Sequence, residues 1–307
     1  MHPLIFVHIP KTAGTSLRET VIEEFGSDNV MVDYGENSRE TSRHVIETIY
    51  KNGDMFALIK NHPKVIFGHV PAKKYINLSR YKNIITFVRD PIERVVSEYK
   101  HVIRHEKYSG TLSSFANIPR NKNTMHQYLS GVSWIALGYV GLSSKYDESV
   151  EMLNSIYGLN LYSKKLNLSP KLQKVKISQE DREELEKLNQ LDISLYEQAA
   201  ENFNWRRTLF NESKPFVHGA WRFNRGKKTI TGFAFYGENE EPVSITIRDQ
   251  LNSEIKVVAD KFHSAIHNHG GRRCGYVGFS VEVKNLELDK VQCLVSSTGQ
   301  PLPCLGK

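Results

Sequence analysis

The sequence predicts a parallel α/β sheet of the P-loop-like nucleotide-binding type, followed by an all-β domain of sandwich-like form. Short apolar runs alternate with amphipathic segments over about the first two thirds of the chain, as strands and helices do in α/β proteins. From residue 216 the pattern changes to short runs of alternating polarity separated by turn residues, which is typical of antiparallel strands. We therefore expect a first domain over 1–213 and a small accessory β domain over 214–307.

Each element is assigned from the period of its apolar residues. In the first domain, strands are expected at 4–9, 30–33, 65–68 and 83–88, where the apolar runs are short and continuous. Helices are expected at 15–25, 38–51, 92–106, 122–129, 146–157 and 179–203. In the second domain, strands are expected at 229–236, 243–248, 254–258, 277–283 and 292–296.

Length and charge set limits on the partners. The chain has 307 residues with 41 basic and 34 acidic side chains, a formal charge of +7, which favours anionic ligands. No basic block with interleaved aromatic residues stands out, so nucleic acid is not an expected partner. The first apolar run begins close to Met1, and no run is long enough for a transmembrane helix. We expect a cytoplasmic protein without a signal peptide, and its oligomeric state stays open.

The first apolar run ends in a short loop that has the composition of a phosphate-binding site. Because a helix is expected to follow at once, the loop would lie on a helix N-terminus, where free N–H groups and the helix dipole favour an anion. Gly14 would let the backbone approach closely, and Lys11 would supply a positive charge. Lys11 precedes the glycine, whereas the lysine of a nucleotide-triphosphate loop follows it, so ATP is not the first expectation. The predicted anion-binding residues are Lys11, Thr12, Ala13, Gly14, Thr15 and Ser16.

A second anion site is predicted where the strand at 83–88 ends. Arg89 follows that strand directly, and Pro91 occupies a position suited to a first helical turn. Ser97 lies two turns further along the helix, so its hydroxyl and the Arg89 guanidinium are expected to converge on one anion. Asp90 is expected to cap the helix or to orient Arg89. Two phosphate sites on one sheet suggest a doubly phosphorylated nucleotide.

The two motifs together resemble the sulfotransferase superfamily, and in particular the heparan sulfate type branch that sulfates glycans at the 2-O and 6-O positions. Residues 10–16 look like the family's 5′-phosphosulfate loop, and the segment from Arg89 through Arg94 to Ser97 looks like its 3′-phosphate site. The resemblance implies 3′-phosphoadenosine 5′-phosphosulfate as donor and a carbohydrate hydroxyl as acceptor. It also assigns Lys164 to a later loop near the 3′-phosphate. Animal members carry an N-terminal membrane anchor, so a bacterial origin fits this chain better.

Sulfuryl transfer to a hydroxyl needs a base to accept the proton and positive charge near the transferred group. Lys11 is the natural source of that charge, and the chemistry requires no metal. His69 is the first candidate base, because it follows the run 65–67 and should lie at the carboxyl edge of the sheet. The family resemblance assigns the same role to the histidine of such a Gly-His segment. His8 is the rival. Glu93 and Glu98 are expected to be solvated.

Other interpretations stay open. A P-loop kinase or nucleotide hydrolase is one alternative, since the strand at 84–88 ends near an aspartate. A noncatalytic glycan-binding protein, in which the β domain does the work, is another. The aromatic residues Trp221, Phe223, Phe233, Phe235 and Tyr236 are candidates for sugar stacking or for the core. Metal binding is left open for His263, His267, His269 and Cys274, whose spacing fits no standard zinc site.

Overall fold

The structure is a computed structural model that describes residues 2–60, 63–106, 108–163, 177–251, 253–283 and 291–305. Its contacts divide the chain into two compact units. The first comprises Met1–Ser79, Asn83–Ser133 and Tyr139–Ala200. The second comprises Arg80–Lys82, Trp134–Gly138 and Glu201–Lys307. The domain boundary near residue 214 stays a prediction.

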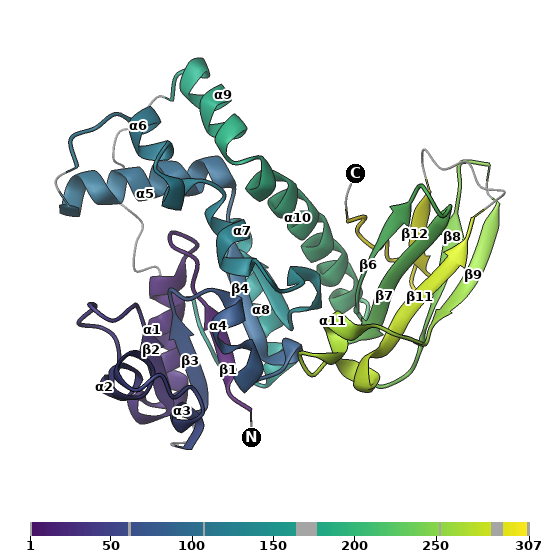
Figure 1. The fold of residues 1–307 in the computed structure, drawn as a ribbon, viewed down its shortest axis with the longest axis horizontal. Helices are drawn as coiled ribbons and strands as arrows, with labels where there is room; N and C mark the ends of the chain where they lie inside the picture. Colours follow the sequence, from purple (N-terminus) through teal and green to yellow (C-terminus); the bar gives the residue numbers. More distant parts are fainter. Residues whose placement is uncertain are drawn as a thin grey trace. The chain divides into compact units, whose positions relative to one another are not determined.

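A five-stranded parallel sheet forms the centre of the first unit (Figure 1). Its strands are β1 (Leu4–Val7), β2 (Val30–Asp33), β3 (Val65–Gly68), β4 (Ile84–Val88) and β5 (Tyr139–Leu142). Nearly every strand residue is buried, because helices cover parallel sheets and the strands then become apolar throughout. The four strands expected in this region are confirmed. The sequence analysis missed β5, which has only four residues and contains a glycine.

The strand order β2-β3-β1-β4-β5 positions the functional site. After β1 the chain forms β2 and β3 on one side of it, and then crosses to form β4 and β5 on the other side. The order therefore reverses at β1 and β4. Ligands of open α/β sheets bind outside the carboxyl ends of the strands at such a reversal, which is where both predicted anion sites begin.

Helices surround this sheet, and α1, α2 and α8 contact its strands. The helices of the first unit are α1 (Gly14–Phe25), α2 (Arg43–Val45), α3 (Ala57–Lys60), α4 (Ala72–Tyr75), α5 (Pro91–Glu106), α6 (Leu112–Ala116), α7 (Thr124–Leu129), α8 (Tyr146–Tyr157), α9 (Gln179–Leu188) and the start of α10 (Gln190–Asn211). A π-helical segment, Ile46–Lys51, continues α2. The helix expected over 179–203 is broken at Asn189, whose buried side chain accepts a hydrogen bond from the Asn123 backbone, 3.0 Å. None of the helices in the described ranges is long and apolar enough to cross a membrane.

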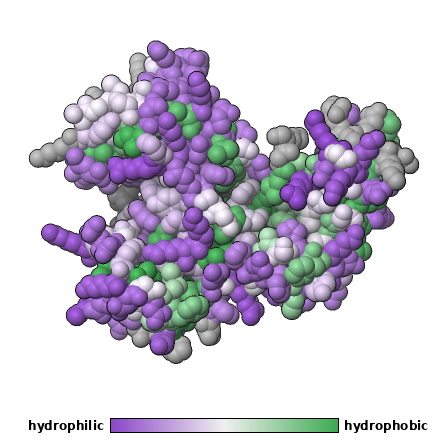
Figure 2. Space-filling model, viewed as in Figure 1, coloured by the Kyte–Doolittle hydropathy of each residue, from purple (hydrophilic) through white to green (hydrophobic). Residues whose placement is uncertain are grey.

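Helices α5, α6 and α9 form a second layer with a hydrophobic cluster of its own. Val95 from α5, Phe115 from α6 and Leu185 from α9 are among its buried members. Hydrophilic side chains cover α9 on the face that Figure 2 shows, as expected for a helix with one buried leucine and an otherwise polar sequence. This cluster fixes α5, the helix that carries the second predicted anion site.

Two antiparallel sheets form the second unit around a shared core, so the expected C-terminal β region is present. The strands are β6 (Val217–Asn224), β7 (Thr229–Tyr236), β8 (Val243–Arg248), β9 (Glu254–Ala259), β10 (Lys261–Phe262), β11 (Tyr276–Glu282) and β12 (Gln292–Val295), with one short helix, α11 (Ser264–His267). One sheet has the order β10-β11-β7-β6 and the other β12-β8-β9. The five strands expected here are found, and β6 and β10 were missed. Trp221, Phe233 and Phe235 are buried, so these three belong to the packed interior and not to a sugar-binding surface.

Candidate active site

The loop between β1 and α1 holds two non-glycine residues in the left-handed backbone region. Lys11 has a φ of 68° and Ala13 a φ of 73°. Such conformations cost on the order of 1–3 kcal/mol each and persist where the surroundings enforce them, often at functional sites. Inside the turn, the buried Thr12 hydroxyl donates a hydrogen bond to the Ile9 carbonyl, 2.9 Å. This turn brings the chain onto the N-terminus of α1.

The N-terminus of α1 has no side-chain cap and no acidic residue in its first turn, so no side chain of this segment competes for its backbone donors. Ala13 is the capping residue, and it cannot satisfy the free N–H groups of the first turn. That turn also contains no acidic side chain, so the positive end of the helix dipole is not neutralised there. Ala13 and Thr15 are exposed, Ser16 is half-buried, and burial lowers the pKa of the nearby Lys11. The loop is therefore suited to an anion from solution.

Gly14 lies directly against the ring of His8. A Cβ atom placed on Gly14 would be 1.9 Å from both Cδ2 and Nε2 of His8, far inside van der Waals contact. The absence of a side chain at this position is thus what allows the loop to approach the end of β1. The close approach that the structure shows at Gly14 is to the His8 ring, and the predicted close approach of this backbone to an anion stays a prediction.

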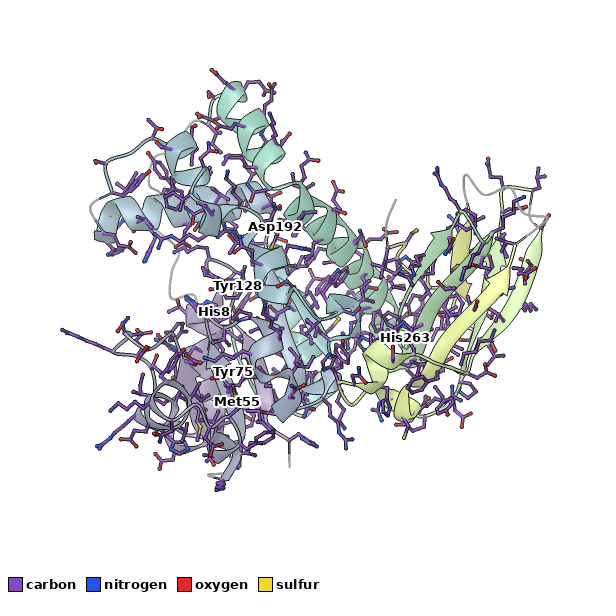
Figure 3. The ribbon with its side chains drawn as sticks, viewed as in Figure 1. His8, Met55, Tyr75, Tyr128, Asp192 and His263 are labelled. Carbon is purple, nitrogen blue, oxygen red and sulfur yellow. The ribbon has the colours of Figure 1, made fainter. Side chains whose placement is uncertain are left out.

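Three aromatic side chains gather at the carboxyl edge of the sheet. His8, Tyr34 and His69 each follow the last residue of a strand, and those strands are neighbours with Val7 and Asp33 both paired to Gly68. The His8 and His69 ring centroids are 4.3 Å apart, and those of Tyr34 and His69 are 4.4 Å apart. His8 Nδ1 shares a hydrogen bond with the Tyr34 hydroxyl, 3.0 Å. Figure 3 labels His8 at the end of β1.

Burial and nearby cations keep both histidines neutral. Burial lowers the pKa of His69 to about 4, and the positive charges of Arg18 and Lys11 act in the same direction, against the opposing charge of Glu40. Burial, followed by the charges of His69, Arg18 and Lys11, also lowers the pKa of His8. His69 Nε2 is buried and finds no hydrogen-bond partner among the described residues. A neutral imidazole with one unsatisfied nitrogen can accept a proton from a ligand.

Arg18 is a member of the site that sequence analysis missed. Its guanidinium lies 5.3 Å from the centroid of the Tyr34 ring and forms an ion pair with Glu40, 2.5 Å. Arg18 is one helical turn beyond Gly14 and so shares its face of α1, which is the signal that could have identified it. Burial raises the pKa of the Tyr34 hydroxyl to about 12, with the Arg18 charge opposing that rise. Tyr34 therefore stays protonated at neutral pH.

Arg89 joins the two predicted anion motifs. Its Nη1 donates a hydrogen bond to the Lys11 carbonyl, 3.3 Å, so the end of β4 is tied to the loop after β1. The same guanidinium pairs with Glu93 on α5, 3.2 Å. Asp90 caps that helix as predicted, accepting a hydrogen bond from the Glu93 backbone, 2.9 Å. Ser97 is half-buried on α5, two turns beyond Arg89.

Two further charged side chains of α5 are largely buried. Arg94 is only 1% exposed, and its Nη2 donates to the Asn121 carbonyl, 3.4 Å, so its side chain lies in the interior, and its part in a 3′-phosphate site stays a prediction. Glu98 is not solvated, because its Oε2 is buried without a hydrogen-bond partner among the described residues, and burial raises its pKa. The charges of Arg94 and Lys11 oppose that rise. Tyr128, labelled with Asp192 in Figure 3, interacts electrostatically with both Glu98 and Arg94. Burial and the charge of Glu98 raise the pKa of its hydroxyl, and the charge of Arg94 opposes that rise.

The remaining predicted residues are Lys164 and the C-terminal group that is left open for metal binding. Lys164 lies outside the described residues. Within the described ranges, no group of three or more histidine, cysteine or acidic side chains is arranged to hold a metal ion. In the C-terminal group left open for metal, His267 Nδ1 pairs with the Cys274 carbonyl, 2.8 Å, and the His263 ring contacts Phe233.

Comparison with known protein families gives a match over the first half of the chain. The model described as "Sulfotransferase family" matches residues 1–155, which span the loop, the aromatic group and Arg89. Among solved structures, the chain is similar to a sulfotransferase from Alicyclobacillus acidocaldarius, at 13% sequence identity and a TM-score of 0.33. That similarity covers 70% of this chain and 97% of the other. No curated protein matches the chain.

Replacing Gly14 with alanine should destabilise the protein by about 1–3 kcal/mol, because the new methyl group overlaps the His8 ring and the loop or the ring must move. Chemical denaturation measures the change. Gly226→Ala is the matched control, since a Cβ there meets nothing closer than 3.6 Å. Equal stability of the two variants would contradict the close contact at Gly14.

Lowering the pH from 6.5 to about 4 should destabilise the fold partly through His69. In that window the unfolded chain protonates this imidazole while the folded chain does not, so the free energy of unfolding falls as pH falls. His69→Asn should reduce that slope by up to about 1.4 kcal/mol per pH unit. Denaturation at several pH values tests this, with His105→Asn at an exposed position as control. An unchanged slope in His69→Asn would show that His69 titrates normally.

Proposed function

Because the chain belongs to the sulfotransferase family, we propose that it transfers a sulfuryl group from 3′-phosphoadenosine 5′-phosphosulfate to a hydroxyl group of a carbohydrate. The observation that carries the proposal is the strained loop of Lys11 and Ala13, tied to Arg89 and placed beside a neutral His69. Anion-binding groups and a proton acceptor thus share one edge of the sheet. These are the two requirements of sulfuryl transfer to a hydroxyl.

The chain offers two sets of groups for the donor nucleotide, which supplies the activated sulfuryl group when it is bound. The free N–H groups of α1, with Lys11, Thr15 and Ser16, would hold the phosphosulfate end. Arg89 and Ser97 would hold the 3′-phosphate, with Lys164 added by family resemblance. The Arg89 guanidinium has a further role, since its hydrogen bond to the Lys11 carbonyl sets the position of the loop.

His69 is the better candidate for the base. His8 already uses Nδ1 in its hydrogen bond with Tyr34, and the Nε2 side of its ring lies under Gly14. His69 Nε2 has no such partner among the described residues and so can accept the hydroxyl proton of the acceptor. We assign His8 and Tyr34 the role of positioning His69, because their rings flank it at 4.3 and 4.4 Å.

A carbohydrate acceptor is supported by the resemblance of residues 10–16 and of the segment 89–97 to the glycan 2-O and 6-O branch. The formal charge of +7 would favour a polysaccharide that carries acidic groups. No metal has a part in the proposed chemistry, because Lys11, Arg89 and the helix N-terminus supply the positive charge.

Calorimetric titration with adenosine 3′,5′-bisphosphate should show binding that adenosine 5′-phosphate and magnesium-ATP do not match. Arg89→Ala should weaken that binding about 10- to 100-fold through loss of charge-assisted hydrogen bonds. Arg43→Ala is the matched control, because Arg43 also pairs with a glutamate four residues on and is exposed. Preference for magnesium-ATP would favour a kinase or hydrolase, and equal effects of the two variants would contradict the 3′-phosphate site.

His69→Ala should lose about 10²- to 10⁴-fold in turnover while it still binds adenosine 3′,5′-bisphosphate, because the residue takes a proton and does not hold the nucleotide. In the wild type, the acid limb of the rate profile should lie near the lowered pKa of about 4 and not near 6.5. Turnover measured with radiolabelled donor and a panel of oligosaccharides tests both points. Full activity of His69→Ala together with an inactive His8→Ala would move the base to His8.

A further inference from the structure

Asp33 places a buried carboxyl group at the end of β2, on the sheet edge that carries the candidate site. A charged group in such a position is costly unless it is paired and hydrogen-bonded, and both of its oxygens are satisfied. Oδ2 accepts hydrogen bonds from the Tyr75 hydroxyl, 2.5 Å, and from Lys74 Nζ, 2.6 Å. Oδ1 accepts them from the Tyr50 hydroxyl, 2.8 Å, and from the Gly35 backbone, 3.0 Å.

These donors keep the Asp33 side chain ionised. Burial by itself would raise the pKa of Asp33, but the hydrogen bonds, of which those from Lys74 and Tyr75 count most, outweigh burial and lower it. Burial and the hydrogen bond to Asp33 raise the pKa of the Tyr75 hydroxyl, so Tyr75 keeps the proton that it donates. Charge-assisted hydrogen bonds of this kind are strong and directional. The Asp33 carboxylate is therefore a firm point of attachment for the elements that donate to it.

Two of the four donors come from α4, the helix that follows His69. Only residues 69–71 lie between the last residue of β3 and the first residue of α4. Tyr75, labelled in Figure 3, is fully buried, and Lys74 precedes it on the same helix. The far end of this short connection is thus attached to the Asp33 carboxylate.

The near end of the same connection is held by the Asp33 backbone. Asp33 is paired with Gly68 across β2 and β3. A Cβ atom on Gly68 would be 1.9 Å from the Asp33 carbonyl oxygen, so the two strands meet here more closely than a side chain would allow. Asp33 therefore holds the chain on both sides of His69. It also precedes Tyr34 directly, and the Tyr34 ring flanks that of His69 at 4.4 Å.

We propose that Asp33 is the positioning residue of His69, with Lys74 and Tyr75 as its partners in this role. The carboxylate fixes α4, and α4 fixes the connection 69–71 that sets where the His69 ring lies beside Tyr34. Asp33 acts through His69 and is not itself a catalytic residue. The role rests on the proposed function, because the position of His69 matters for turnover only where His69 is the base. A displacement of about 1 Å at a reacting group can cost about 10²-fold in rate.

The test compares Tyr75→Phe with Tyr50→Phe. Each variant removes one hydroxyl donor to the same carboxylate, but Tyr75 lies on α4, whereas Tyr50 lies in the π-helical segment Ile46–Lys51. The first measurement is the pKa of His69 from its imidazole NMR resonances, assigned with His69→Asn, which needs no substrate. That pKa should be about 4 in the wild type and in Tyr50→Phe, and it should move toward 6.5 in Tyr75→Phe as the ring becomes less buried.

Turnover with radiolabelled donor is the second measurement. Tyr75→Phe and Asp33→Asn should lose about 10- to 100-fold in kcat, because the base is displaced. Their KM for the donor should stay close to that of the wild type, since the proposed donor groups lie on the loop after β1 and on α5. Tyr50→Phe should keep both constants close to those of the wild type.

Each possible result decides the proposal. A raised His69 pKa and a lowered kcat in Tyr75→Phe, with Tyr50→Phe near the wild type, support it. The same His69 pKa in all three proteins overturns it, and so does an equal loss of kcat in the two tyrosine variants, which would make the carboxylate a general structural support. If Asp33→Asn fails to fold, the two tyrosine variants still decide. If the wild type transfers no sulfuryl group, the proposed function fails separately, and the pKa of His69 still shows whether Asp33 positions it.

Discussion

The contact between Gly14 and the His8 ring sets how closely the first loop approaches the sheet, and the rest of the site depends on that distance. The loop must pass over a histidine without a side chain in the way, and its two left-handed residues follow from the tight return of the chain. Once the loop is seated, the Lys11 carbonyl accepts the Arg89 hydrogen bond, which joins the ends of β1 and β4. A single backbone position therefore supports both halves of the proposed anion site.

The carboxyl edge of the sheet carries two kinds of group, cations and neutral imidazoles. Lys11, Arg18 and Arg89 are cations near the start of α1 or the end of β4, and they attract anions. The same positive charges, together with burial, make protonation of His8 and His69 unfavourable. A site that concentrates positive charge thus also maintains neutral imidazoles, which is the protonation state that a base requires before it reacts. The two properties come from one arrangement of residues.

Local patterns predicted the parts of the structure that depend on short stretches of sequence. The parallel strands, the loop before α1, the Asp90 cap and most strands of the second unit follow from apolar period and capping chemistry. Side-chain burial could not be predicted in the same way. Arg94 and Glu98 have the polarity of surface residues but face the interior of the first unit, and Arg18 belongs to the site through a helix face that only the fold aligns with Tyr34. In the second unit, the aromatic residues that alternate along β6 and β7 are mostly buried, whereas Phe262 on the two-residue β10 is exposed.

The equivalent positions of His8, Tyr34 and His69, at the ends of their strands, limit which insertions and deletions this protein can accept during evolution. Each residue follows its strand immediately, and the three strands are aligned at Val7, Gly68 and Asp33. Because side chains alternate between the faces of a strand, inserting or deleting one codon within β1, β2 or β3 would turn the following aromatic side chain away from its neighbours. The lengths of these short strands are therefore constrained as strictly as the identities of the residues that follow them, and tolerated length variation should be confined to the connections between them.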